Sequence, residues 1–141
     1  AIDVAGAGGS SWSEVERHRA RTEHERQVAA AFVAWGLPTA ESLIMAKEGA
    51  PGLPIIASGG IRNGIDIAKA VALGAAACGV AGPFLPAASR SAAAATELAA
   101  VLIDQLRVAM FAAGARDIAG LRTIPLSLRQ EGDHDGRSSE P

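Results

Sequence analysis

Two glycine-containing loops and one arginine are the residues of this 141-residue chain that most favour anion binding. The apolar run Pro54-Ile55-Ile56-Ala57 ends in Ser58-Gly59-Gly60-Ile61-Arg62, and a second loop contains Ala81-Gly82. Glycines let a ligand approach the backbone closely, and the N–H groups of a helix start together with a guanidinium suit a phosphate dianion. We therefore expect Gly60, Arg62 and Gly82 to converge on one phosphate. The alternative is that these glycines only make tight turns.

Alternating strands and helices must hold these loops. Short apolar runs at residues 2–5, 54–58 and 77–81 have the character of buried strands, and each leads into a loop that contains glycine. Helical patterns lie between them, which predicts right-handed βαβ units and a parallel sheet. Because three strands leave open sheet edges, we expect the chain either to assemble with another or to be part of a larger barrel or doubly wound sheet.

Capping signals and periodicity place the helices. Thr22 and Glu25 have capping-box spacing, which predicts a helix running to about Trp35 with Val28, Phe32 and Trp35 on one apolar face. Thr39 is expected to cap the helix that follows it. Further helices are predicted from residue 14 (capped by Ser13), from 40 to 47, from 65 to 73 (capped by Asn63), from 91 to 113 and, after Asp117, to 121. Residues 82–88 are predicted to form a turn followed by a short helix that ends at Ala88.

Composition excludes several classes. The net charge of −2 gives no electrostatic basis for a nucleic-acid or membrane partner. Cys78 is the only cysteine, so an intrachain disulfide or a zinc cluster is excluded, and a reducing cytoplasm fits. No run resembles a membrane span or a signal peptide. Because the chain opens within a strand and without Met, we expect upstream sequence to be missing. Residues 1–127 are interpreted as part of one domain and 128–141 as a disordered polar tail.

Three segments together resemble the type 2 isopentenyl-diphosphate isomerase family. They are Asp3-Val4-Ala5-Gly6-Ala7-Gly8-Gly9-Ser10-Ser11-Trp12, Ala57-Ser58-Gly59-Gly60-Ile61-Arg62-Asn63-Gly64 and Gly79-Val80-Ala81-Gly82-Pro83-Phe84-Leu85. Trp35-Gly36-Leu37-Pro38-Thr39 and Ala109-Met110-Phe111 match the same family in order and spacing. Each motif alone is shared with other FMN barrels, whereas the set is distinctive and covers residues 1 to about 126.

The resemblance implies an α/β fold: the C-terminal portion, about strands six to eight with their helices, of a (β/α)8 TIM barrel. It implies reduced FMN and Mg²⁺ as cofactors, NADPH as the reductant, and interconversion of isopentenyl and dimethylallyl diphosphate in isoprenoid biosynthesis. It also implies a cytoplasmic homo-oligomer, completed by the missing N-terminal half of the barrel.

The same resemblance assigns the site residues. Ser10 stands where the family has a threonine that contacts FMN. Gly60, Ile61 and Arg62 match the segment that holds the FMN phosphate, and Ala81 and Gly82 match its partner loop. The metal, substrate and acid/base residues would lie upstream, so no catalytic residue or metal ligand is expected here and the chain alone is expected to be inactive. Asp3 is interpreted as a structural residue of the first strand.

Two alternatives remain open. The first is another FMN barrel, such as a 2-hydroxy-acid oxidase. That class is expected to carry a His-Gly-Gly-Arg segment after strand six, and Gly6-Ala7-Gly8-Gly9 has no histidine. The second is a non-catalytic, truncated half-barrel that binds phosphate.

Overall fold

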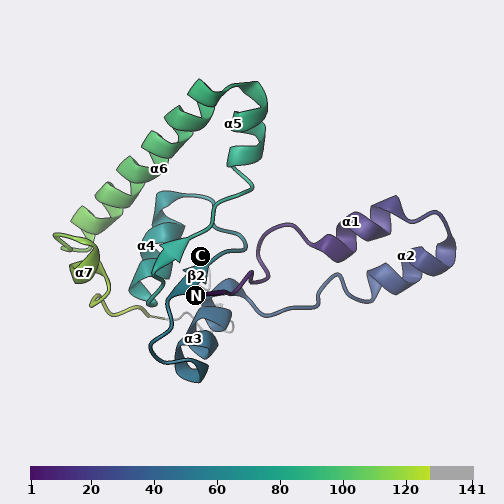
Figure 1. Cartoon of the computed structure of the whole chain (residues 1–141), viewed down its shortest axis with the longest axis horizontal. Helices are drawn as coiled ribbons and strands as arrows, with labels where there is room; N and C mark the ends of the chain where they lie inside the picture. Colours follow the sequence, from purple (N-terminus) through teal and green to yellow (C-terminus); the bar gives the residue numbers. More distant parts are fainter. Residues whose placement is uncertain (128–141) are drawn as a thin grey trace, which may run out of the picture.

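The computed structural model describes residues 1–127, and a parallel sheet lies at the centre of its α/β body (Figure 1). The strands lie in the order β1-β2-β3, with Ile2 opposite Ile55 and Ile56 opposite Ala77. This confirms the predicted parallel sheet, although each strand is shorter than predicted. The elements are β1 (Ile2–Asp3), α1 (Trp12–Arg19), α2 (Glu23–Ala30), α3 (Thr39–Gly49), β2 (Ile55–Ala57), α4 (Gly64–Ala72), β3 (Ala77–Cys78), α5 (Phe84–Arg90), α6 (Ala92–Ala112) and α7 (Ile118–Leu121).

The core surrounds the central strand. Ile55 and Ala57 of β2 are buried together with Leu43 of α3 and Ala70 of α4. The helix that precedes β2 in the chain and the helix that follows it therefore both contribute to this core. A second apolar cluster joins α4 to α7, with Val71 and Leu121 buried in it. The small side chains let the helices approach the sheet closely, and burying this apolar surface stabilises the body.

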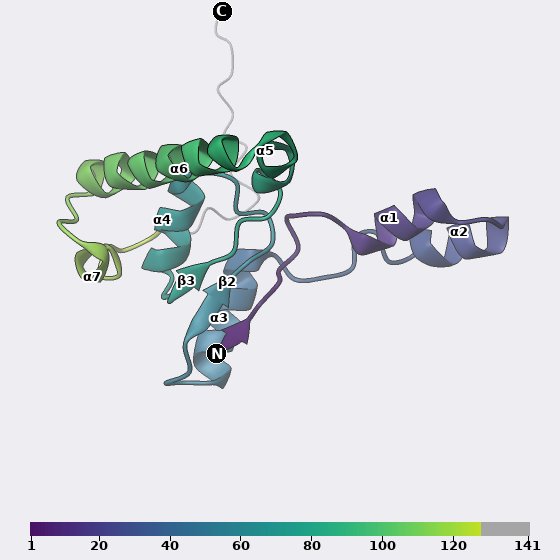
Figure 2. The same ribbon diagram turned by 45° about the horizontal axis from the view of Figure 1, so that its top comes forward.

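Helix α6 packs against α4 (Figure 2). Gly64, the first residue of α4, makes this approach possible, because a Cβ there would collide with the backbone of Leu106 and the side chain of Gln105. The Gly64 N–H donates to Gln105 Oε1 at 2.9 Å. The predicted cap at Asn63 is confirmed, since its Oδ1 accepts from Asp66 N at 2.9 Å.

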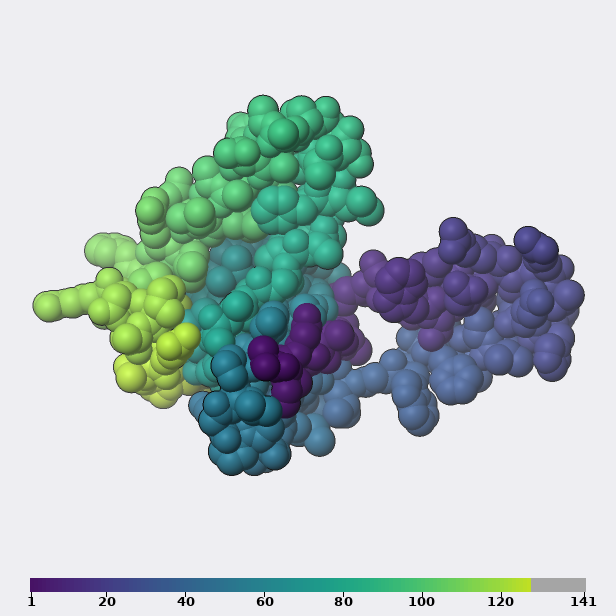
Figure 3. All heavy atoms as spheres, viewed as in Figure 1, coloured from purple at the N-terminus to yellow at the C-terminus, as the bar shows by residue number. Residues whose placement is uncertain are grey.

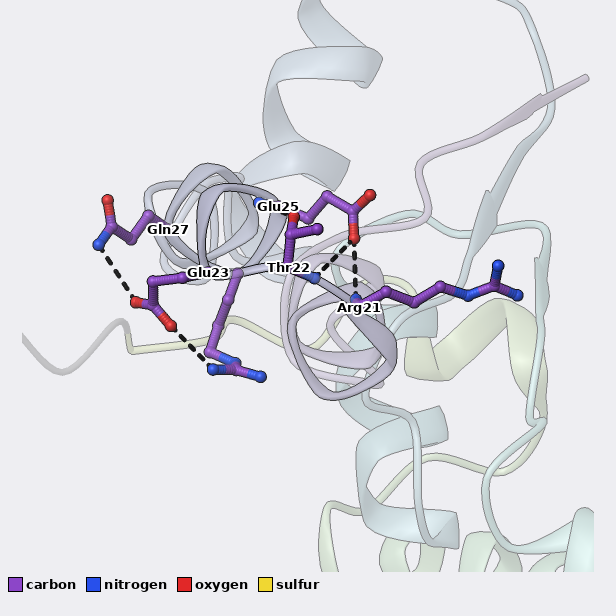
Figure 4. A network of polar contacts seen from close by, with 6 residues as sticks. Arg21, Thr22, Glu23, Glu25 and Gln27 are labelled. Atoms are coloured by element: carbon purple, nitrogen blue, oxygen red, sulfur yellow. Dashed lines mark hydrogen bonds and ion pairs between the residues drawn. The ribbon is translucent and has the colours of Figure 1, made fainter.

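Helices α1 and α2 pack against each other and form an arm that stands clear of the body in Figures 1 and 3. The predicted capping box is present: Thr22 Oγ1 accepts from Glu25 N, and the Glu25 carboxylate accepts from Thr22 N and Arg21 N (Figure 4). Helix α1 begins earlier than predicted, because Ser11 and not Ser13 is its N-cap and accepts from Glu14 N.

The prediction of one helix from residue 22 to Trp35 is wrong. Helix α2 ends at Ala30 and turns follow, with Ala31 N donating to the carbonyl oxygens of both Gln27 and Val28. Val28, Phe32 and Trp35, which are predicted to share one apolar face, are all exposed. A short helix needs a core to pack against, and the arm lies away from the core of the body.

The remaining cap signals agree with the structure in part. Asp117 caps α7 as predicted, with its Oδ1 accepting from Gly120 N at 2.7 Å. Thr39 does not cap α3: that helix begins at Thr39 itself, and Pro38 is its N-cap. The predicted tail at 128–141 lies outside the described residues. Among residues 1–127, no helix combines the length and the apolar character that a membrane crossing requires.

Candidate functional site

A hollow of about 760 Å³ lies where the loops that follow β1, β2 and β3 meet. The carboxyl ends of parallel strands share one edge of a sheet, which explains why loops distant in sequence converge here. All the residues predicted to bind the cofactor line this hollow, namely Ser10, Gly60, Ile61, Arg62, Ala81 and Gly82. The structure therefore brings the predicted set together.

The first two loops are bound to each other. Gly6 N donates to the Ser58 carbonyl oxygen at 2.9 Å, and Arg62 Nη2 donates to the Gly8 carbonyl oxygen at 3.0 Å. Gly59 and Gly60 have φ values of 94° and 79°, which disfavour any other residue type. A Cβ on Gly59 would overlap the Gly6 carbonyl oxygen, and one on Gly60 would collide with Gly8. These glycines serve the packing of loop on loop, a reason different from the ligand approach predicted from sequence.

The third loop leaves open space. A Cβ added to Gly82 would meet no atom of residues 1–127 within 4 Å. Ser10 and Arg62 are exposed in the hollow, so a hydroxyl and a guanidinium are accessible as donors. The Ile61 side chain is buried in the core beside Leu43, which leaves its main chain as the part available to a ligand. Such a donor set suits an anion.

The start of α4 is not itself a free anion site, contrary to the sequence-based expectation. Arg62 N donates to Asp66 Oδ2 at 3.0 Å, Asp66 N donates to Asn63 Oδ1, and Gly64 N donates to Gln105. These three amides are occupied within the chain, and the Asp66 carboxylate opposes a second negative charge beside them. An anion in the hollow therefore depends on the loops and the guanidinium.

Asp3 and Ser58 form a contact that the sequence does not predict. Asp3 Oδ1 accepts from Ser58 Oγ and, at 3.1 Å, from Ala5 N. Ala5 has a φ of 40°, an uncommon value for a residue with a side chain. The bonds tie the end of β1 to the loop after β2, which fits the structural role expected of Asp3.

The histidines, the cysteine and the acidic residues are the other candidates for a functional site. Among residues 1–127, His, Cys, Asp and Glu form no group of three or more that could hold a metal ion. His18 and His24 are exposed on the arm. Burial raises the pKa of the Cys78 thiol, and Cys78 packs against the core. Trp12, for which the sequence leaves a place at the border of the site and a packing role equally open, lines the hollow with 77% of its surface exposed.

Comparison with known proteins decides the family. The model of the family described as FMN-dependent dehydrogenase matches residues 13–127. The chain belongs to this family. Its α/β architecture fits that membership, and FMN is the cofactor that the family's description names.

Curated relatives carry the name predicted from the sequence motifs. The isopentenyl-diphosphate delta-isomerase of Cronobacter sakazakii is 49% identical over 126 residues, 89% of this chain and 36% of the relative. The isomerase of the same name from Stutzerimonas stutzeri is 50% identical over 126 residues, with the same coverage. The resemblance is thereby confirmed, and the chain spans about a third of the length of these relatives.

Solved structures of mandelate oxidase also match. Mandelate oxidase with (S)-2-phenylpropionate is 32% identical with a TM-score of 0.58, covering 62% of this chain and 27% of that one. A mandelate oxidase mutant with the monooxide FMN adduct is 26% identical with a TM-score of 0.59, covering 80% of this chain and 45% of that one. The likeness spans most of the described residues.

Proposed function

We propose that residues 1–127 form the C-terminal part, about strands six to eight, of an FMN-dependent (β/α)8 barrel that converts isopentenyl diphosphate to dimethylallyl diphosphate. The observation that carries the proposal is the convergence of Ser10, the Gly60–Arg62 segment and the Ala81-Gly82 loop on one hollow. The name shared by relatives that are 42–50% identical supports the isomerase over other members of the family.

The residues present fit the phosphate of FMN. Arg62 offsets part of the phosphate charge, and among residues 1–127 its guanidinium uses one of its five N–H donors, on the Gly8 carbonyl oxygen. The Ser10 hydroxyl donates from the first loop, and Gly82 leaves space for the phosphate oxygens. When bound and reduced, the flavin supplies the proton transfer at the allylic carbon. The chain itself binds and orients the cofactor.

The remaining parts of the proposal concern what lies outside this segment. Mg²⁺ would be held by upstream residues, as the resemblance to the isomerase family implies. We also propose that NADPH reduces the flavin, and that the complete enzyme is cytoplasmic and forms a homo-oligomer. The N-terminal half of the barrel is the partner that completes the site, and the chain alone is proposed to be inactive.

Two chimaeras test the proposal. Residues 1–127 replace the matching C-terminal segment in the Cronobacter sakazakii isomerase and, separately, in mandelate oxidase. We expect the first chimaera to isomerise isopentenyl diphosphate with FMN, a reductant and Mg²⁺, and the second not to oxidise mandelate. An FMN-loaded isomerase chimaera without turnover would contradict the isomerase assignment. Turnover by the 141-residue chain alone would contradict the proposed need for an N-terminal half.

A 2-hydroxy-acid oxidase is the second candidate, favoured by the likeness to mandelate oxidase. Against it, the loop after β1 contains no histidine, and His18 and His24 lie exposed on the arm. Mandelate oxidation by the second chimaera would favour this candidate. A purified chain that binds FMN while both chimaeras stay inactive would favour the third reading, a non-catalytic half-barrel.

A further inference from the structure

Thr39 uses its hydroxyl in an unusual way for the first residue of a helix. A threonine at a helix start commonly accepts a hydrogen bond from an amide of its own first turn. Here the N-cap is Pro38 and no side-chain cap is formed. Thr39 Oγ1 instead donates to the Gly59 carbonyl oxygen at 2.5 Å, with the Ser58 carbonyl oxygen at 3.4 Å. The Thr39 hydroxyl therefore contacts the loop after β2, 20 residues further along the chain, and does not cap α3.

The loop that Thr39 holds is a partition between two hollows. Gly59, Gly60 and Ile61 line the large hollow on one side. They also line a smaller one, of about 240 Å³, which Thr39, Leu43, Lys69 and Leu73 help to form between α3 and α4. Packing against Gly6 and Gly8 holds this loop in place, and the bond to Thr39 is the contact that holds the Gly59 carbonyl group towards α3.

The bond to Thr39 sets the direction of the next amide. In a trans peptide the C=O and the following N–H point in opposite directions, and no cis peptide is found among residues 1–127. With the Gly59 carbonyl held towards Thr39, the Gly60 N–H points away from α3. It makes no hydrogen bond to any group of residues 1–127. Gly9, which lines the large hollow, leaves this nitrogen uncovered, since a Cβ there would lie 3.0 Å from it.

Thr39 is itself well anchored. Ala7 N donates to the Leu37 carbonyl oxygen at 2.7 Å, and Ala7 pairs with Pro38 in an isolated parallel bridge. A Cβ on Gly6 would collide with Thr39, so the first loop packs directly against it. The hydroxyl is thus held by the same segment that supports the first loop, and it can act as a fixed tether.

We propose that Thr39 is a positioning residue, which fixes the Gly59–Gly60 peptide so that the Gly60 N–H donates to a phosphate monoester dianion in the large hollow. The inference rests on the proposed function for the identity of that anion as the FMN phosphate. Thr39 touches neither the ligand nor reacting atoms, and its effect passes through one peptide bond.

Binding of FMN and of riboflavin to the 141-residue chain tests this assignment. Thr39→Val, which removes the hydroxyl at constant shape, is expected to raise the Kd for FMN about tenfold. Thr39→Ser restores the donor and is expected to bind FMN within about twofold of wild type. Riboflavin, which has no phosphate, is expected to bind all three chains equally. The matched control is Ser42→Ala, which removes a hydroxyl of the same helix that donates to Leu37.

Three outcomes would overturn the proposal: wild-type FMN affinity in Thr39→Val, no rescue by Thr39→Ser, or an equal loss of riboflavin affinity. Failure of the wild-type chain to bind FMN would count instead against the part of the proposed function that gives residues 1–127 a competent phosphate half-site. In that case the effect of Thr39 on the Gly59–Gly60 peptide is measured directly, from the chemical shift of the Gly60 amide in NMR spectra of the same chains. We expect one signal in wild type and Thr39→Ser and a shifted or doubled signal in Thr39→Val, whereas an unchanged signal would refute the role.

Discussion

Arg62 Nη2 donates a hydrogen bond to the carbonyl oxygen of Gly8 at 3.0 Å, across 54 residues of sequence. The side chain predicted to bind the ligand thus also joins the loops after β1 and β2. Because the guanidinium has donors to spare, one contact orients it and the others remain for an anion. Substitution of this residue therefore tests cofactor binding and loop structure together.

Arg62→Ala is expected to raise the Kd for FMN by about 10- to 100-fold, since a charge-assisted contact and the tether to Gly8 are both lost. Arg62→Lys keeps the charge but not the planar fork, and an intermediate loss is expected. Quenching of flavin fluorescence in the isomerase chimaera measures both. The control is Arg107→Ala on α6, whose partner is Asp104. Wild-type affinity in Arg62→Ala would show that the loop is wrongly assigned.

Gly59→Ala and Gly52→Ala separate steric collision from backbone strain. The two glycines have φ values of 94° and 92°, but only Gly59 faces a neighbouring backbone, that of Gly6. Gly52→Ala is expected to lower the free energy of unfolding by about 1–3 kcal/mol through strain alone. Gly59→Ala is expected to cost about 1–3 kcal/mol more, or to prevent folding. Urea denaturation measures both, and equal losses would contradict the close approach of the two loops.

Both tryptophans of the chain lie between Ala7 and Pro38, the residues at the base of the arm. Of the two, Trp12 lines the large hollow and Trp35 does not. Trp12 and Trp35 are 77% and 79% exposed, so acrylamide is expected to quench both in the free chain. Saturation with FMN is expected to protect Trp12, measured in Trp35→Phe, and to leave Trp35, measured in Trp12→Phe, accessible. Protection of Trp35 alone would place the flavin elsewhere.

The Cys78 thiol is expected to react slowly. Burial raises its pKa, so the reactive thiolate is scarce near neutral pH, and Ellman's reagent should modify it more slowly than free cysteine until urea unfolds the chain. The folded state keeps this proton to a higher pH than the unfolded state. The free energy of unfolding should therefore fall as the pH rises above the ordinary thiol pKa of about 8.5. In Cys78→Ala, this decrease in the free energy of unfolding at high pH should be absent. Rapid modification of the Cys78 thiol by Ellman's reagent in the folded chain at pH 8 would contradict the raised pKa.

Local signals in the sequence predict much of this fold. The apolar runs and the caps at Thr22, Asn63 and Asp117 locate elements, and the glycine loops locate the site edge, because each depends on neighbouring residues. Thr39 shows the limit of such reasoning. Its type predicts a cap, yet its hydroxyl has a better partner in Gly59, which only the folded chain brings near.

The arm shows a second limit. The spacing of Val28, Phe32 and Trp35 predicts an apolar face, but periodicity cannot say what that face packs against. In residues 1–127 the face is exposed. The packing of Gly59 against the Gly6 backbone could not be predicted from the sequence either. A glycine required by a neighbouring backbone looks the same in a sequence as a glycine required by a ligand.

The pairing of Ala7 with Pro38 closes the arm at its base, so the chain leaves the body and returns to it at adjacent points. Helix α2 lies beyond this closure and lines neither hollow, so insertions and deletions in it would not change the register of the three strands or the partition between the two hollows. The outer end of the arm can therefore change in length and surface while the edge of the sheet where the three loops meet keeps its structure.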